Sequence, residues 1–205
     1  MIYPEGKDIY PSQFRRDKFI FIHIPKCAGS SFLDSYLGYQ LGHIPASAYA
    51  AMDPKLFQDS FSCAFIRNPI DRFRSAYNHI HTCSLWPYLP QKAQLIEKAA
   101  SSLTELAESI HCYPEILAMD WFRPQHEFLM VRGRLGVSRV FKSEKYEEAV
   151  SWISDNIGIS LHYARGEVNV RSKKGLIHNS QNISNDGIEN LRNVYWKDFT
   201  LFGYF

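Results

Sequence analysis

The sequence has no long apolar run and little net charge. Its longest apolar run, Phe19–Ile24, is far shorter than the roughly 20 residues that a membrane-spanning helix needs. The formal net charge is only +2, so we do not expect general nucleic-acid binding through a strongly basic surface. Residues 1–18 contain no apolar segment typical of a secretion signal. These absences favour a cytoplasmic protein without a membrane span.

Cysteine is scarce, and the cysteines form no metal-binding pattern. There are four of them, namely Cys27, Cys63, Cys83 and Cys112. None belongs to a C-x-x-C pair, so no zinc signature is present and no metal is expected. Reduced, mostly buried thiols are the simplest interpretation. A disulfide between Cys83 and Cys112 stays open.

Hydrophobic residues make up 45% of the 205 residues, which allows a sizeable core in a single domain spanning 1–205. The continuous apolar run Phe19–Ile24 predicts a buried parallel strand, and Ser62–Ile66 predicts a second. Apolar residues at helical spacing predict a helix over Ser31–Leu41, capped by Ser30 or Ser31. A further helix is expected from Pro69 to about His79. This alternation indicates an α/β fold with a parallel sheet flanked by helices.

The second half of the chain has weaker patterns. We expect a long helix over Gln91–Ile110 and two strands, Phe128–Val131 and Ser138–Lys142, around the turn RGRLG. An amphipathic helix is expected over Lys145–Asn156. A last helix begins at Asp186 or Gly187 and ends near Tyr195.

The stretch KFIFIHIPKCAGSSF (Lys18–Phe32) has the features of an anion-binding cradle. Ligands of parallel α/β sheets bind beyond the carboxyl ends of the strands, where a helix N-terminus offers free amides. Gly29 allows close approach of the backbone, and Lys26 adds a full positive charge. An ordinary strand–helix turn with a solvated lysine is the alternative. The cradle consists of Pro25, Lys26, Cys27, Ala28, Gly29, Ser30 and Ser31.

The cradle differs from the loop that binds nucleoside triphosphates. That loop requires G-x-x-x-x-G-K-[ST], in which the lysine comes late, beside a hydroxyl that binds magnesium. Here Lys26 precedes the small residues. A kinase or NTPase is therefore disfavoured.

The stretch AFIRNPIDRFRSAYNH (Ala64–His79) supplies a second candidate anion site. Arg67 ends a predicted strand, and Ser75 follows Arg72 by about one helical turn. A guanidinium and a hydroxyl suit a phosphate monoester. A strand-end arginine that forms a salt bridge is the alternative.

Taken together, these segments resemble the sulfotransferase family that uses 3′-phosphoadenosine 5′-phosphosulfate (PAPS). PKCAGSSF resembles the family's 5′-phosphosulfate loop, and RNPIDRFRSAY resembles its 3′-phosphate motif RNPxxRxxSxY. GHIPA, FRPQHEFL and the ending HNSQN…YWKDFTLFGYF also resemble family segments. The most similar branch is the carbohydrate-type group, which includes heparan sulfate 2-O-sulfotransferases and short bacterial members. The resemblance spans about Phe19 to Phe205.

The resemblance implies a P-loop-like three-layer fold and a donor that is bound at both anionic ends. The cradle would bind the 5′-phosphosulfate, while Arg67 and Ser75 would bind the 3′-phosphate. The product would be 3′-phosphoadenosine 5′-phosphate (PAP), and no metal is implied. Three basic residues would also reach the nucleotide, or would form a solvated loop: Arg171, Lys173 and Lys174.

The resemblance also implies in-line transfer of a sulfuryl group to an acceptor hydroxyl, which we expect to belong to a carbohydrate. Lys26 would stabilise the leaving phosphate, and His43 would act as general base. His43 follows a helix that points away from the cradle, so the chain must fold back. We expect His23 to be a core histidine that supports Lys26. The other candidate bases are His79, His81, His126 and Glu127.

The acceptor site is less defined. His79 and Gln125 are our candidates for acceptor binding. Some aromatic residues are expected either to stack on sugar rings or to belong to the core: Trp86, Tyr88, Trp121 and Phe122. The acceptor's identity and the oligomeric state are not predicted.

Two residues of the cradle depart from the common family pattern PKTGGTS. Cys27 replaces a threonine and lacks its hydroxyl, and Ala28 replaces a glycine and disfavours a positive φ. Two alternative functions stay open: a nucleotide-dependent phosphotransferase, which the early position of Lys26 disfavours, and an inactive nucleotide-binding module, which intact Lys26, Arg67 and Ser75 disfavour.

Overall fold

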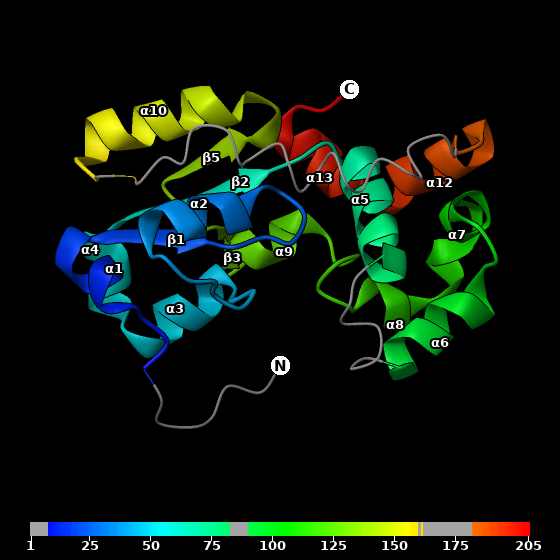
Figure 1. Ribbon diagram of the computed structural model, residues 1–205, viewed down its shortest axis with the longest axis horizontal. Helices are drawn as coiled ribbons and strands as arrows, with labels where there is room; N and C mark the ends of the chain where they lie inside the picture. Colours follow the sequence, from blue (N-terminus) through cyan, green and yellow to red (C-terminus); the bar gives the residue numbers. More distant parts are fainter. Residues whose placement is uncertain (1–7, 83–89, 160, 162–181) are drawn as a thin grey trace. The chain divides into compact units, whose positions relative to one another are not determined.

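The computed structural model describes residues 8–82, 90–159, 161 and 182–205 (Figure 1). The chain divides into two compact units. We call Met1–Ile66 with Gln125–His162 the sheet unit, and Arg67–Pro124 with Tyr163–Phe205 the helical unit. The single domain expected from chain length stays a prediction.

The sheet unit is built on three parallel strands in the order β1-β2-β5. They are β1 (Phe19–Ile22), β2 (Phe61–Ile66) and β5 (Arg139–Lys142). In the register of the sheet, Phe19 faces Phe61 and Cys63 faces Arg139. Helices flank this sheet, which confirms the predicted α/β class with a central parallel sheet. All four residues of β1 are buried, as the continuous apolar run predicts.

One face of the sheet is rich in phenylalanine and is covered by α2 (Gly29–Tyr36) and α10 (Tyr146–Ile157). Side chains alternate along a strand, so Phe21 in β1 and Phe65 in β2 lie on the same face. Phe32 of α2 contacts both, with ring centroids at 4.5 Å from Phe21 and 5.5 Å from Phe65. Tyr146 of α10 contacts Phe65 at 5.3 Å. In Figure 1, α10 lies above the sheet and α3 lies below it.

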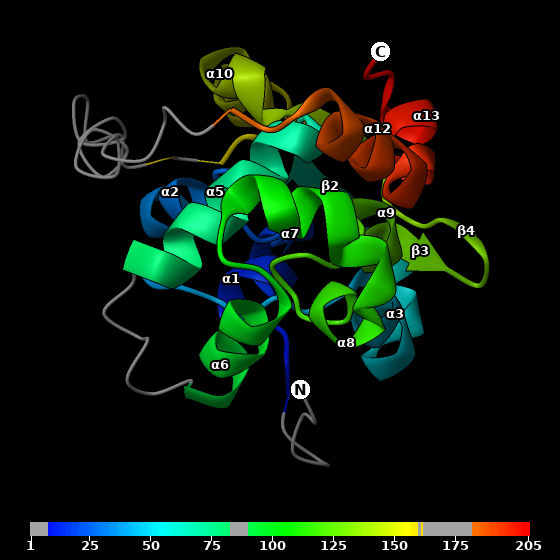
Figure 2. The same cartoon turned by 90° about the vertical axis from the view of Figure 1, so that its right-hand side faces the viewer.

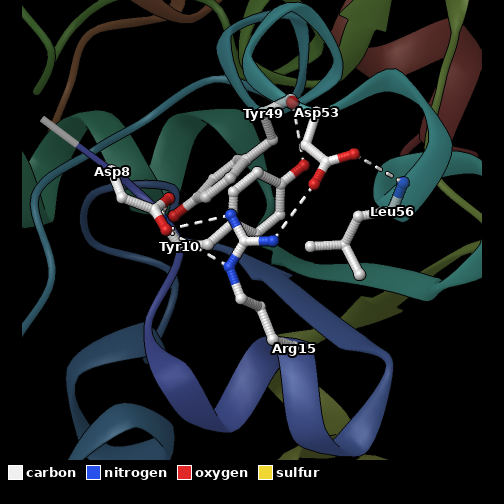
Figure 3. A network of polar contacts seen from close by, with 6 residues as sticks. All are labelled: Asp8, Tyr10, Arg15, Tyr49, Asp53 and Leu56. Carbon is white, nitrogen blue, oxygen red and sulfur yellow. Dashed lines mark hydrogen bonds and ion pairs between the residues drawn. The ribbon is translucent and has the colours of Figure 1, made fainter. Parts of the chain in front are cut away.

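The remaining elements of the sheet unit are α1 (Ser12–Asp17), α3 (Ala46–Met52), α4 (Pro54–Asp59), α9 (Gln125–Leu129), β3 (Met130–Val131), β4 (Arg134–Leu135) and the 3-10 helix η3 (Ser143–Lys145). Figure 3 shows how polar contacts join the N-terminal segment to α3 and α4. The Tyr10 hydroxyl donates to the Tyr49 carbonyl at 2.8 Å, and Arg15 donates to Asp53 at 3.1 Å. The Asp53 side chain in turn caps α4 by accepting the backbone N–H of Leu56.

Of the two strands predicted around RGRLG, Ser138–Lys142 is confirmed as β5, and only the end of Phe128–Val131 forms a strand, β3. The hairpin pairs β3 with β4, and its turn is formed by Arg132 (φ 50°) and Gly133 (φ 79°). Two successive residues with positive φ match the right-handed twist of a tight two-residue hairpin. The chain therefore turns earlier than expected, and Arg139–Lys142 pairs with β2 in the main sheet instead.

All regular secondary structure in the described part of the helical unit is helical. The helices are α5 (Pro69–Thr82), α6 (Pro90–Ala99), α7 (Leu103–Ser109), the 3-10 helix η2 (Ile110–Cys112), α8 (Pro114–Leu117), α12 (Asn185–Val194) and α13 (Trp196–Phe202). The predicted helix Gln91–Ile110 is interrupted, because Ser102 caps a new helix by accepting the backbone N–H of Glu105. The last predicted helix corresponds to α12.

Helices α7 and α12 pack closely although they are distant in the sequence (Figure 2). The Asn190 side-chain amide donates to the Ala107 carbonyl at 2.7 Å. A Cβ atom added at Gly187 would lie 3.2 Å from the Cβ atom of Ala107. Small residues at the contact therefore allow the C-terminal segment to complete the helical unit.

Candidate functional site

The cradle is a loop between β1 and α2 in which left-handed backbone conformations recur. Lys26 has φ 66°, and Ala28 has φ 64°. Ala28 is the N-cap residue of α2, and no side chain caps the helix, so the predicted cap by Ser30 or Ser31 is wrong. The first amides of α2 have no partner within the helix, as at every helix N-terminus. Alanine at position 28 thus adopts the conformation that favours glycine, at a cost of about 1–2 kcal/mol.

Gly29 is required by space and not by conformation. It is the first residue of α2, and a Cβ atom added to it would overlap the ring of His23. The same atom would lie 3.2 Å from Cε1 of Phe21. Glycine therefore lets the start of α2 lie directly on the end of β1.

Cys27 points into the protein and joins the cradle to the start of α9. Its side chain is 1% exposed, and Sγ lies 3.2 Å from Oε1 of Gln125. The thiol donates to this amide oxygen, and it also lies 3.6 Å from the Pro25 carbonyl. Gln125 is fully buried. The proposed binding of an acceptor by Gln125 stays a prediction, and its contact in this structure is with the cradle.

The chain after α2 folds back to the cradle, as a base at His43 requires. The helix ends at Tyr36, earlier than the predicted Leu41. The Gln40 amide then donates to the Ser30 carbonyl at 2.9 Å. Nδ1 of His23 lies 3.1 Å from the Leu41 carbonyl oxygen. The half-buried His43 ring is 4.8 Å from that of His23, in an edge-to-face arrangement.

The environment of His23 favours its neutral form. The pKa of His23 is lowered to about 4, mainly by burial and to a smaller extent by positive charge at His43 and at Lys26, while the hydrogen bond to Leu41 acts in the opposite direction. The imidazole is therefore neutral near pH 7. Its single proton is on Nδ1, because a carbonyl oxygen can only accept a hydrogen bond. Nε2 is then unprotonated.

The second motif begins directly after β2 and continues into α5. Asn68 caps this helix, since its side-chain oxygen accepts the backbone N–H of Ile70 at 3.0 Å. Pro69 is the first helical residue, a position that needs no N–H donor. Arg67 and Ser75, the predicted 3′-phosphate ligands, are both half-buried. Much of this motif thus builds the helix start.

Arg72 has a structural role that the sequence did not reveal. Its side chain is 2% exposed and donates to the carbonyls of Asp120 at 3.1 Å and Arg123 at 2.9 Å. The Tyr195 hydroxyl donates to the Phe122 carbonyl at 2.7 Å. Buried side chains therefore fix the backbone of residues 120–123 from two distant parts of the helical unit.

The aromatic candidates for acceptor binding differ in exposure. Phe122 is fully buried and packs on Phe73 at 5.4 Å, so it belongs to the core. Trp121 is half-buried, and its ring centroid lies 6.2 Å from that of His79. Trp86 and Tyr88 lie outside the described residues.

The other predicted candidates are distributed over both units. His126 is half-buried and Glu127 is exposed, both in α9, while His81 is exposed in α5. Arg171, Lys173 and Lys174 lie outside the described residues. Among the described residues, Cys27, Cys63 and Cys112 form no disulfide with one another, and Cys83 lies outside the described part.

In the part of the chain that the structure describes, no group of three or more His, Cys, Asp or Glu side chains is arranged to hold a metal ion. None of the helices in the described ranges has the length and apolar character needed to cross a membrane.

Comparison with known proteins adds one match. A model described as "Sulfotransferase family" matches residues 45–205, most of the chain. The matched region contains Arg67 and Ser75 and begins after the cradle and after His43. No curated protein and no solved structure matches the chain.

Proposed function

Since the chain belongs to the sulfotransferase family, we propose that it transfers the sulfuryl group of PAPS to a hydroxyl of a carbohydrate acceptor. The observation that favours this proposal most is the cradle beside His43. A loop with two left-handed residues leads into a helix N-terminus, and the chain folds back to bring a half-buried histidine to it. Anion binding and proton transfer are the functions that sulfuryl transfer requires.

Two groups of residues would bind the donor. Backbone amides that follow residues with alternating left- and right-handed conformations form a concave anion site, and the N-terminus of α2 adds its partial positive charge. We assign the 5′-phosphosulfate to this cradle, with Lys26 as the charged contact. We assign the 3′-phosphate to Arg67 and Ser75. Arg171, Lys173 and Lys174 are further candidates for the nucleotide.

Sulfuryl transfer depends more on positioning of the reactants and on charge stabilisation than on covalent catalysis by the protein. The acceptor oxygen attacks sulfur in line with the bond that breaks. His43 accepts the hydroxyl proton during this attack. Lys26 stabilises the negative charge that develops on the phosphate oxygen as it leaves. His79, beside Trp121, is the candidate for acceptor binding in the helical unit.

The nature of the nucleotide separates this proposal from a phosphotransferase or an inactive module. The measurement is thermal unfolding with PAP, compared with ATP plus magnesium. A ligand at 100 times its dissociation constant stabilises a protein by about 2.7 kcal/mol. We expect stabilisation by PAP. Stabilisation by ATP and magnesium alone would refute the proposal, and PAP binding without turnover of any acceptor would favour the inactive module.

The role of His43 is tested by His43→Ala in an assay with labelled PAPS. We expect kcat to fall by about 100-fold or more while PAP affinity stays the same, because general base catalysis contributes about that much. The matched control is His111→Ala, since His111 is an exposed histidine of the helical unit. Near wild-type turnover of His43→Ala would exclude His43 as the base. Lys26→Ala should weaken both PAP binding and turnover.

A further inference from the structure

His23 contacts three parts of the cradle region: the start of α2, the returning chain and the candidate base His43. Its ring lies against Gly29, where a Cβ atom would overlap it, so it abuts the first residue of α2. Its Nδ1–H donates to the Leu41 carbonyl in the returning chain. Its ring also contacts that of His43 at 4.8 Å. One side chain thus joins the helix start, the returning loop and the candidate base.

The protonation state of His23 suits a fixed support. The ring is 6% exposed and neutral near pH 7, so a single tautomer with the proton on Nδ1 satisfies the Leu41 carbonyl. A neutral ring places no like charge beside Lys26 or beside a protonated His43. Packing alone would be served equally well by phenylalanine, which is abundant in this core. The polar contact to Leu41 is what a phenylalanine cannot supply.

We propose that His23 is a positioning residue for His43: its Nδ1–H holds the carbonyl of Leu41 and so fixes the loop that presents His43 to the cradle. This inference rests on the proposed function, in which His43 is the base. Leu41 lies two residues before His43, so releasing its carbonyl frees the backbone on which the base is carried. Catalysis is sensitive to such displacement, since a shift of about 1 Å can cost on the order of 100-fold.

Three substitutions separate the hydrogen bond from the shape of the ring. His23→Asn keeps an N–H donor near the position of Nδ1, His23→Gln places its amide near the position of Nε2, and His23→Phe keeps only a ring. We expect His23→Phe and His23→Gln to lower kcat by roughly 10- to 100-fold. We expect His23→Asn to remain within about threefold of wild type, and PAP affinity to change less than about twofold in all three, since the cradle is intact.

A second measurement guards against a general loss of structure. His23→Phe is combined with His43→Ala, and kcat is measured well below the melting temperature of each variant. If His23 acts through His43, the second substitution causes no further loss, whereas a merely structural effect would lower kcat in both backgrounds.

The possible results separate a failure of the positioning role from a failure of the proposed function. Wild-type kcat in His23→Phe, an equal loss in His23→Asn and His23→Phe, or a further loss in the His43→Ala background would overturn the positioning role alone. A wild-type protein that binds no PAP would overturn the proposed function, and this inference with it.

Discussion

The cradle and the start of α5 are both candidate anion sites, but they are built in opposite ways. In the cradle most of the proposed anion contacts would come from the backbone, through the amides that follow left-handed Lys26 and Ala28 and those of α2, with the Lys26 side chain as the charged contact. The Cys27 side chain faces the protein interior, and the lack of a side chain at Gly29 leaves room for the ring of His23. In the second motif, side chains would bind the anion.

The second motif divides its side chains between construction and binding. Asn68 caps α5, and Arg72 is buried against backbone carbonyls. Arg67 and Ser75 are half-buried and are assigned to the ligand. Motif residues of one type therefore need not share one role. Two arginines of the same motif, Arg67 and Arg72, illustrate this.

The largest effect on stability is expected at Arg72. Arg72→Met removes donors to two carbonyls in a buried position, and each unsatisfied buried group costs about 1–3 kcal/mol. We expect the free energy of unfolding to fall by roughly 2–5 kcal/mol in urea titration. Arg74→Met is the control, because Arg74 forms a surface ion pair with Asp71 that contributes about 1 kcal/mol or less. Equal losses in both variants would contradict the division of roles.

The second-largest effect on stability is expected from pH, through protonation of His23 beside the cradle. His23 binds a proton near its ordinary pKa of 6.5 when unfolded but only near 4 when folded. Between these values the unfolded chain binds more protons, so the free energy of unfolding decreases as pH falls from about 6.5 to about 4. The total change from this group is about 3 kcal/mol. We expect urea titrations across this range to show a shallower pH dependence in His23→Asn than in wild type. An identical slope would show that burial does not suppress protonation of His23.

The smallest effect is expected at Ala28. Ala28→Gly relieves a left-handed alanine, a gain of about 1–2 kcal/mol that is partly offset by the entropy glycine adds to the unfolded chain. We expect the variant to gain up to about 1 kcal/mol of stability and to keep its affinity for PAP. Ala50→Gly in α3 is the matched control and should lose about 1 kcal/mol. A loss in both variants would mean that position 28 is not strained.

The sequence predicted the parallel strands well because buried strands of this kind are continuous apolar runs. Phe19–Ile22 and Phe61–Ile66 lie where such runs occur. The hairpin around Arg132 was misplaced, because the conformation of a turn decides which residues pair, and arginine rarely adopts a positive φ. Helix boundaries failed where local caps intervened, as at Ser102.

The site was predictable to the level of motifs and no further. Spacing identified the cradle and the second motif, since their residues are close in the sequence. The contact between Cys27 and Gln125 joins residues 98 positions apart, and no local pattern indicates it. No local pattern indicates the hydrogen bond from Arg72 to the Arg123 carbonyl either, or the ring contact between His23 and His43. Residues 171–174 lie outside the described part, so the proposed roles of this basic loop stay predictions.

The central claim is that the two motifs recognise the two anionic ends of one nucleotide. Calorimetric titration with PAP and with adenosine 5′-phosphate, which lacks the 3′-phosphate, tests it most directly in wild type, Arg67→Ala and Lys26→Ala. The account predicts that wild type prefers PAP by about 10- to 100-fold, the value of a hydrogen bond to a charged group. Arg67→Ala should lose this preference, and Lys26→Ala should weaken both ligands alike. Arg67→Ala that still prefers PAP as strongly as wild type would contradict the account.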